Sequence, residues 1–329
     1  MIGISYRQST PKYDAYLKMI QARLLTKKCT YSEDSEVKRF ISDYIEGDKF
    51  ETMMNTPANQ LKSLITQIEQ KYTQLKDCRK NKAVQKSTPL YQYLKWHLMT
   101  HGYKDGFQKN GTPYKLDREE LIESVGIDVC PYCNRTFIYS QQSAKKHKII
   151  QAELDHFYSK DLFPYLAIAK YNLVPSCSFC NRQSGKYTTD AYEEKMVNPY
   201  EIQSATDFLR FRLRVKNANM TSLDKLADGL TLKLIANNPN MCSNIDVMNL
   251  EELYQHHTDY AAELYFKWKV KATHIYRKSM KDILRKCGIN LTDDDIKRVI
   301  VGNYVKEPDF GKRPLSKMMH DISEELGLI

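Results

Sequence analysis

The chain has 329 residues, of which 42% are hydrophobic, and its formal net charge is +10. This length exceeds one ordinary core and predicts two or three packed units. The sequence has no run of about twenty apolar residues, and residues 1–16 lack the apolar core of a signal peptide. We therefore expect a cytoplasmic protein rather than a membrane protein, and the positive charge favours a polyanionic partner such as nucleic acid.

The first part of the chain, residues 1–115, is predicted to be a helical region. Apolar residues recur at helical spacing between Leu61 and Leu75, and Pro89 and Gly102 mark the ends of a second periodic stretch. Helices are therefore predicted at 58–75, 89–102 and 117–126. The basic or polar segments rich in helix breakers are predicted to be loops, at 79–89 and 109–117.

The pattern changes in the segment 116–200, which we predict to be a separate small domain. Two runs of β-branched and aromatic residues, "TFIYS" (136–140) and "IIQAELDHF" (149–157), flank a polar and basic connection. Such runs are typical of strands, so we expect them to pair as a hairpin.

The remaining residues, 201–329, are predicted to form a C-terminal domain of short strands and helices. Polar and apolar residues alternate over 208–216 and 229–235, as they do in strands with one buried face. One long helix is expected over 249–288, with Gly288 as its stop, and a short helix near the C-terminal end. The whole pattern is typical of an α+β protein.

Eight cysteines are present, and four of them form two Cys-x-x-Cys pairs, Cys130 with Cys133 and Cys177 with Cys180. Two such pairs supply the four thiolates of a closed, structural zinc site. A redox protein would need a thioredoxin-like βαβ context around one pair, and the sequence does not provide it. The other four cysteines are expected to be small buried apolar residues.

Residues suited to catalysis lie between the cysteine pairs and just after the second. Asp155 is a hard oxygen ligand for Mg²⁺, and His156 is an imidazole that can take a proton from water. In a continuing strand these neighbours would face opposite sides, so the strand has to end or bend there. Asn172 can brace the intervening loop, and the zinc site should fix Asn181 where its amide oxygen can join Asp155 on the metal.

Two basic residues follow the second cysteine pair. Arg182 and Lys186 are candidates for contacts to neighbouring phosphates, and a position on a solvated helix surface explains them equally well.

Together, Asp155-His156, Asn172 and Asn181 beside a cysteine pair resemble the HNH nucleases. The resemblance covers the segment around 130–190. It implies a zinc-stapled, treble-clef-like ββα-metal core embedded between the two helical regions. It also implies that His156 is the general base, that Asp155 and Asn181 bind one Mg²⁺ or Mn²⁺, and that Asn172 orients the site. Asn181 stands where many members have histidine.

A longer string, "CPYCNR", "ELDHFYSK" and "YNLVPSCSFCN" followed by "VNPY", resembles the nuclease subunits of Septu anti-phage systems, which also occur beside some retrons. That resemblance implies a nucleic-acid substrate, DNA or RNA, and an ATPase partner. The alternative is a zinc-stabilised module that binds nucleic acid or a protein partner without cleaving. It explains the thiols and the charge but not the Asp155-His156 pair.

Overall fold

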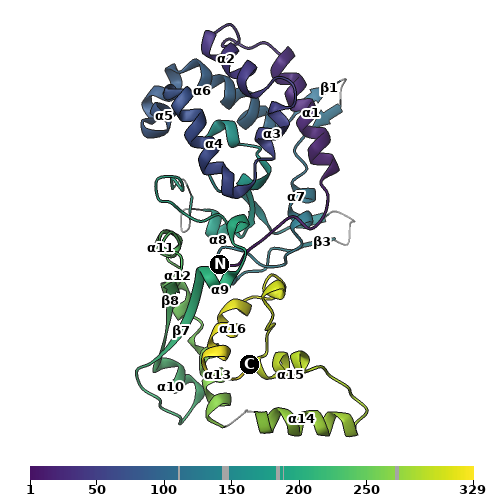
Figure 1. The fold of residues 1–329 in the computed structure, drawn as a ribbon, viewed down its shortest axis with the longest axis vertical. Coiled ribbons are helices and arrows are strands. Elements are labelled where there is room, and N and C mark those ends of the chain that lie inside the picture. The colour runs from purple at the N-terminus through teal and green to yellow at the C-terminus, as the bar shows by residue number, and fades with distance from the viewer. Residues whose placement is uncertain (110–111, 143–147, 183–185, 188, 271–273) are drawn as a thin grey trace.

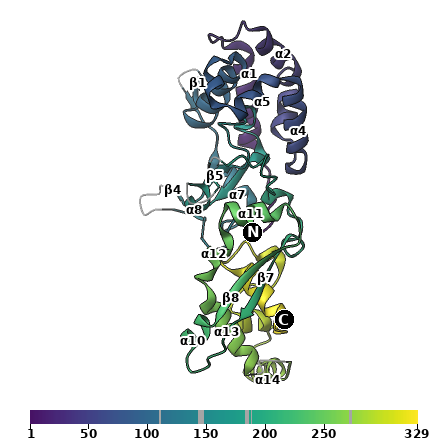
Figure 2. The ribbon, with the colours of Figure 1, turned by 90° about the vertical axis from the view of Figure 1, so that its left-hand side faces the viewer.

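The structure is a computed structural model, and it describes the chain except for residues 110–111, 143–147, 183–185, 188 and 271–273. The molecule is elongated, with the N-terminal helices at one end, the C-terminal elements at the other and the cysteine-bearing segment between them (Figure 1). The view turned by 90° shows the same order along the long axis (Figure 2). The fold is α+β and mostly helical, and the strands of the described residues form two-stranded antiparallel sheets.

The N-terminal end is a packed group of helices. Its elements are α1 (Pro11–Thr26), α2 (Ser35–Tyr44), α3 (Lys49–Met54), α4 (Ala58–Lys71), α5 (Thr73–Lys80), the 3₁₀ helix η1 (Lys82–Ser87), α6 (Pro89–Leu94) and the π-helix η2 (Lys95–Lys104). Pro11 and Pro89 begin α1 and α6, where the proline removes no helical hydrogen bond. The Asp34 side chain caps α2 by accepting hydrogen bonds from two of its first amides.

Two helix predictions in this region needed correction. The helix expected over 58–75 is divided at Tyr72, where the backbone leaves the helical conformation between α4 and α5. Segment 79–89, expected to be a loop, contains the end of α5 and all of η1. The helix expected over 89–102 is α6 followed by η2, and it continues past Gly102 to Lys104. This π-helical continuation brings Tyr103 to the central segment.

The central segment contains α7 (Arg118–Val125), the hairpins β1 (Phe107–Lys109) with β2 (Thr112–Tyr114) and β3 (Ser140–Gln142) with β4 (Lys148–Ile150), and then β5 (Glu153–His156), β6 (Leu173–Ser176) and α8 (Ser178–Asn181). The prediction that 149–157 pairs with 136–140 is right only in part. Strand β4 pairs with β3, whereas β5 pairs with β6, with Asp155 opposite Val174. Part of the basic connection, 143–147, lies outside the described residues, and 109–117 holds part of a hairpin rather than a loop alone.

The C-terminal end combines one hairpin with helices. Its elements are η5 (Pro199–Glu201), α9 (Ala205–Phe208), β7 (Leu209–Val215), α10 (Leu223–Asp228), β8 (Leu230–Ala236), α11 (Met241–Val247), α12 (Leu250–Gln255), α13 (Thr258–Lys269), α14 (His274–Lys286), α15 (Asp293–Val301), η6 (Glu307–Asp309) and α16 (Ser316–Glu325). The two predicted alternating strands are confirmed as β7 and β8, and the structure pairs them with each other. The single helix expected over 249–288 is instead α12, α13 and α14, because His256 and His257 leave the helical conformation between the first two.

The first residues of the chain lie in the middle of the molecule rather than with the N-terminal helices. The Ile2 amide donates to the carbonyl of Pro131 at 2.9 Å, and the Ile4 amide donates to the carbonyl of Pro199 at 3.1 Å. Both isoleucines are buried. The domain boundaries at 115 and 200 stay predictions. Among the described helices, none has the length and apolar character needed to cross a bilayer.

Candidate metal centre and active site

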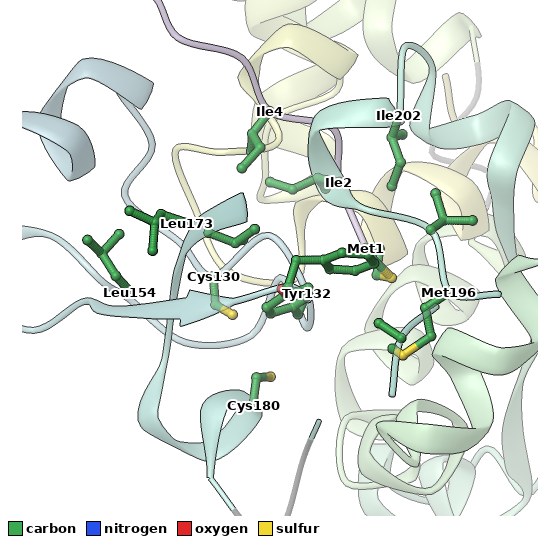
Figure 3. Close-up of a cluster of buried hydrophobic side chains, with 14 of the residues drawn as sticks. Met1, Ile2, Ile4, Cys130, Tyr132, Leu154, Leu173, Cys180, Met196 and Ile202 are labelled. Atoms are coloured by element: carbon green, nitrogen blue, oxygen red, sulfur yellow. The ribbon is translucent and has the colours of Figure 1, made fainter. Parts of the chain in front are cut away.

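The four paired cysteines form a compact buried cluster. Cys130 and Cys133 lie in the turn that follows Val129, and Cys177 and Cys180 come from the start and the body of α8. Their sulfur atoms all lie within 4.8 Å of one another. Figure 3 shows one cysteine of each pair, Cys130 and Cys180, near Tyr132. The sulfurs of Cys133 and Cys177 are 3.9 Å apart, and tetrahedral zinc–thiolate geometry requires a separation of about 3.8 Å. The cluster is therefore compatible with a zinc site.

The chemistry of the cluster also points to a cation. Burial raises the pKa of the Cys130 thiol, because a thiolate without a counter-charge is unfavourable away from water. Four thiolates at this distance would repel one another. A bound divalent ion reverses both effects, so these donors suit a soft metal such as zinc.

Asp155 lies on β5 and is almost completely buried. Its Oδ2 accepts a hydrogen bond of 2.6 Å from the Tyr132 hydroxyl, which lies between the two cysteines of the first pair. Its Oδ1 accepts a hydrogen bond of 3.1 Å from the Lys186 ammonium. The cysteine cluster thus helps to position this carboxylate, because it fixes the backbone on either side of Tyr132.

His156 is the last residue of β5, and its imidazole is buried. Nε2 lies 2.8 Å from the carbonyl oxygen of Ala167, and a carbonyl can only accept, so Nε2 carries the proton. Nδ1 is then the basic nitrogen. Burial lowers the pKa of His156 well below its ordinary value, and the nearby Lys160 adds to this effect, so the ring is neutral at physiological pH.

Asn172 is fully buried and braces the loop that follows β5. Its side-chain oxygen accepts from the amide of Tyr158 at 2.7 Å, and its side-chain nitrogen donates to the carbonyls of Tyr158 and Leu166, both at 3.0 Å. The Asn172 carbonyl accepts from the amide of Phe157. The side chain therefore holds both ends of the loop that includes Ala167, the partner of His156.

Asn181 ends α8, one residue after Cys180. Its side-chain nitrogen donates to the Glu153 carboxylate at 2.7 Å, which leaves Oδ1 as the atom that can bind a cation. Arg182 is exposed and pairs with the other oxygen of Glu153 at 2.6 Å. Glu153 therefore orients both residues.

Lys186 is not on a solvated helix surface. It is fully buried, and besides Asp155 it donates to the backbone carbonyl of His156 at 2.7 Å. The sequence offered no sign of this, because a lysine near the end of a short helix is usually exposed. The buried ammonium neutralises Asp155 from within the protein.

Three of the predicted residues line one cavity of about 320 Å³. Asp155, His156 and Asn181 share it with Tyr103, Leu154, Ser159, Lys160, Asp161 and Tyr187. Because β5 ends at His156, the neighbouring Asp155 and His156 both reach this cavity, although they would face opposite sides of a continuing strand. Asn172 lies behind it, in the loop.

The residues at the cavity suit a hard divalent ion. Each carboxylate oxygen of Asp155 accepts one protein hydrogen bond and retains a second lone pair. Asn181 adds an amide oxygen. Mg²⁺ commonly takes one or two protein ligands and completes its shell with water and substrate phosphates, so Asp155 and Asn181 fit such an ion.

Several residues at the site were missed by sequence reasoning. Tyr132 had a local signal, since it lies inside the first cysteine pair. Tyr103 had none: its ring packs edge-on against His156, with ring centroids 4.3 Å apart, from the distant helix η2. Lys160 follows the Asp155-His156 pair closely, but its orientation toward the cavity depends on the turn of the loop.

Comparisons with known proteins give one partial match. No family model matches the chain, and no solved structure matches it. Over 47 residues the chain is 43% identical to the Septu protein PtuB of Bacillus thuringiensis. The matched segment is 14% of this chain and 18% of that relative, so the chain shares a short segment with this Septu protein.

Proposed function

We propose that the protein is a metal-dependent endonuclease of the HNH type that hydrolyses phosphodiester bonds in nucleic acid. The observation that carries this proposal is the cavity that Asp155, His156 and Asn181 share beside the four-thiol cluster. The cluster, loaded with structural zinc, holds the two segments that bring these side chains together. Strands β5 and β6 followed by α8 have the order of a ββα unit.

The residues of the site divide the reaction between them. The neutral His156 ring, fixed through Nε2 by Ala167, accepts a proton from water at Nδ1. The resulting hydroxide attacks the phosphorus, and the bond to the departing oxygen breaks. Asn172 keeps the loop and hence the ring in place. Asp155 and Asn181 would hold one Mg²⁺ or Mn²⁺, which would supply positive charge for the phosphate and the leaving group.

We further propose a role in bacterial anti-phage defence. The partial identity to PtuB supports a Septu-like system, and such a system implies a PtuA-like ATPase as partner. A pull-down of the two co-expressed proteins tests this part separately from the chemistry. A stable complex with a PtuA-type ATPase is the expected result, and failure of the two proteins to associate would contradict it.

One observation favours the alternative of a binding module that does not cleave. Both oxygens of Asp155 already accept hydrogen bonds, one of them from the buried Lys186 ammonium. A protein that contains zinc and binds nucleic acid but never cleaves it with added Mg²⁺ or Mn²⁺ would support this second function.

His156→Ala tests the nuclease proposal directly. General-base catalysis typically contributes about 10²–10⁴-fold, so the variant should lose at least hundredfold in cleavage of plasmid DNA or RNA with Mg²⁺ or Mn²⁺. His256→Ala is the matched control, because His256 is exposed and lies outside the cavity. Cleavage by His156→Ala at the wild-type rate would overturn the assignment of the base.

A further inference from the structure

The ring of Tyr103 is contacted by three functional groups at once. The His156 ring lies edge-on at 4.3 Å between centroids, the Arg118 guanidinium carbon is 4.4 Å from the ring centroid, and the Lys160 ammonium is 5.8 Å from it. Two hydrogen bonds hold Tyr103 itself. Its hydroxyl donates to the carbonyl of Leu154 on β5, and its own carbonyl accepts from Arg118. The ring is thus a fixed platform with two cations beside it.

Among the described residues, Lys160 has no anionic partner at ion-pair distance. Within the described part of the chain its ammonium makes neither an ion pair nor a hydrogen bond, although the residue is partly buried and lines the cavity with His156. Burial lowers the pKa of Lys160. Lys104 and Lys186 lower it further, whereas Asp161 and Asp155 raise it. An ammonium removed from water without a partner is costly, and an anion in the cavity would compensate.

Arg118 is the second cation beside the Tyr103 ring. It lines an adjoining cavity of about 450 Å³ that also includes Tyr103, Glu153 and Asn181. Its one hydrogen bond to a described residue goes to the Tyr103 carbonyl. A guanidinium has five donors in a planar fork that matches phosphate oxygens. Donors therefore remain for a ligand that enters beside the site.

We propose that Lys160 and Arg118 form a phosphate rim, a pair of cations that binds the nucleic-acid backbone on the His156 side of the cavity. Tyr103, carried by the N-terminal helices, fixes their spacing. The rim rests on the proposed nuclease function and deepens it, because it names the contacts that hold the substrate. It also gives the N-terminal helices a part in the site. Arg182 is less suited to this task, since it is already paired with Glu153.

Lys160→Met tests the rim. Binding of a short fluorescein-labelled single strand, DNA and RNA in separate titrations, is measured by anisotropy without added divalent ions, so that no cleavage occurs. Loss of a charge-assisted hydrogen bond should weaken binding by about ten- to hundredfold. The slope of log K against log salt should become shallower by about 0.7, because one phosphate contact fewer releases fewer counterions. Lys160→Arg should retain most of the affinity.

Lys28→Met is the matched control, since Lys28 is exposed on the far helical end and pairs with Glu33. It removes the same charge and should leave affinity and salt slope unchanged. Circular dichroism and thermal unfolding check that all variants fold. Wild-type affinity and salt slope in Lys160→Met would overturn the rim, even if His156→Ala abolishes cleavage. If the wild-type protein cleaves nothing but Lys160→Met still loses binding, the rim stands and the nuclease proposal fails.

Discussion

Two buried histidines differ in how their ring nitrogens are satisfied. His156 donates from Nε2 to a carbonyl, whereas neither nitrogen of His97 has a hydrogen-bond partner in the structure. His97 lies on η2, between the rings of Tyr93 and Trp96 at centroid distances of 4.4 and 4.5 Å. Burial lowers the pKa of His97 from 6.5 to about 3. The neutral His97 imidazole therefore packs as an apolar group would, and the burial of its two unsatisfied nitrogens is unfavourable.

The His97 imidazole should make the protein sensitive to acid. Below pH 6.5 the His97 imidazole binds a proton in the unfolded chain, but in the folded protein it does so only near pH 3. The free energy of unfolding therefore falls as the pH drops between these values. The expected slope is about 1 kcal/mol per pH unit. Urea unfolding at several pH values should show a shallower dependence for His97→Leu than for wild type. His156 contributes in the same direction, so some dependence should remain.

The control for this experiment is His256→Leu, which changes an exposed histidine and should preserve the wild-type slope. At neutral pH His97→Leu should also be more stable by about 1–3 kcal/mol, because it removes two unsatisfied polar atoms. Identical pH dependence in wild type and His97→Leu would show that this histidine does not carry the effect.

Among the elements, the β5–β6 hairpin depends on one side chain. Asn172 makes three side-chain hydrogen bonds to the backbone of the loop that joins the strands, all in the buried interior. Asn172→Ala should therefore destabilise the protein by about 3 kcal/mol or more, because it leaves buried backbone groups without partners. Asn172→Asp should also destabilise, since it places an oxygen against two carbonyl oxygens. Urea unfolding measures both effects.

Asn55→Ala offers a matched comparison. The Asn55 side chain also donates to a backbone carbonyl, but that bond is exposed to water. Its loss should change stability by no more than about 0.5 kcal/mol. A loss of similar size in Asn172→Ala and Asn55→Ala would mean that Asn172 does not brace the loop.

The sequence predicted elements well where one face of the element decides its position. Strands β7 and β8 alternate polar and apolar residues, and the structure pairs them over their whole length. Prediction from the sequence failed where contacts between distant segments decide which strands pair. Strand β5 could have paired with the preceding run, but it pairs with β6, which leads directly into the second cysteine pair.

The residues of the candidate site were likewise predictable where their sequence signal is local and unpredictable where packing between distant segments places them. The four cysteines have a local signal, the Cys-x-x-Cys spacing, and the structure brings them together as predicted. Asp155, His156 and Asn181 lie close to that cluster in the sequence, so the motif alone could indicate that they share a cavity. Tyr103 reaches the site from the N-terminal helix η2, and Arg118 reaches it from α7. No periodicity in the sequence reveals either placement. The burial of Lys186 likewise depends on the Asp155 carboxylate that receives it.

On the scale of the whole molecule, the turn at residues 131–134 is a junction. The Ile2 amide donates to the carbonyl of Pro131, and the Tyr254 hydroxyl of α12 donates to the carbonyl of Cys133 at 2.5 Å. Asn134, in the left-handed conformation, is fully buried. It donates to the carbonyl of Phe310 and accepts from the amide of Lys317. Both ends of the chain therefore depend on the segment that bears the first cysteine pair.

Loss of the proposed zinc ion should consequently unfold more than the cysteine cluster. Metal analysis should find one zinc per chain in wild type and none in Cys177→Ser. That variant should lose several kcal/mol of stability, because a structural zinc site contributes directly to folding. Thermal unfolding and near-ultraviolet circular dichroism measure the effect.

Cys242→Ser is the control, since Cys242 lies outside the cluster and, contrary to the expectation from the sequence, is exposed. It should keep both its zinc and its stability. A wild-type protein without zinc, or a Cys177→Ser variant as stable as Cys242→Ser, would contradict the structural role of the metal.

The bonds between Asn134 and the segment 310–317 have a consequence for biosynthesis. Translation delivers Asn134 of the first cysteine turn 176 residues before Phe310 and 183 residues before Lys317. The partners of Asn134 emerge only after these further residues, so a shorter nascent chain cannot complete this turn. A truncated translation product that ends before residue 310 would carry every residue of the proposed active site. It would lack the hydrogen bonds that Asn134 makes to Phe310 and Lys317.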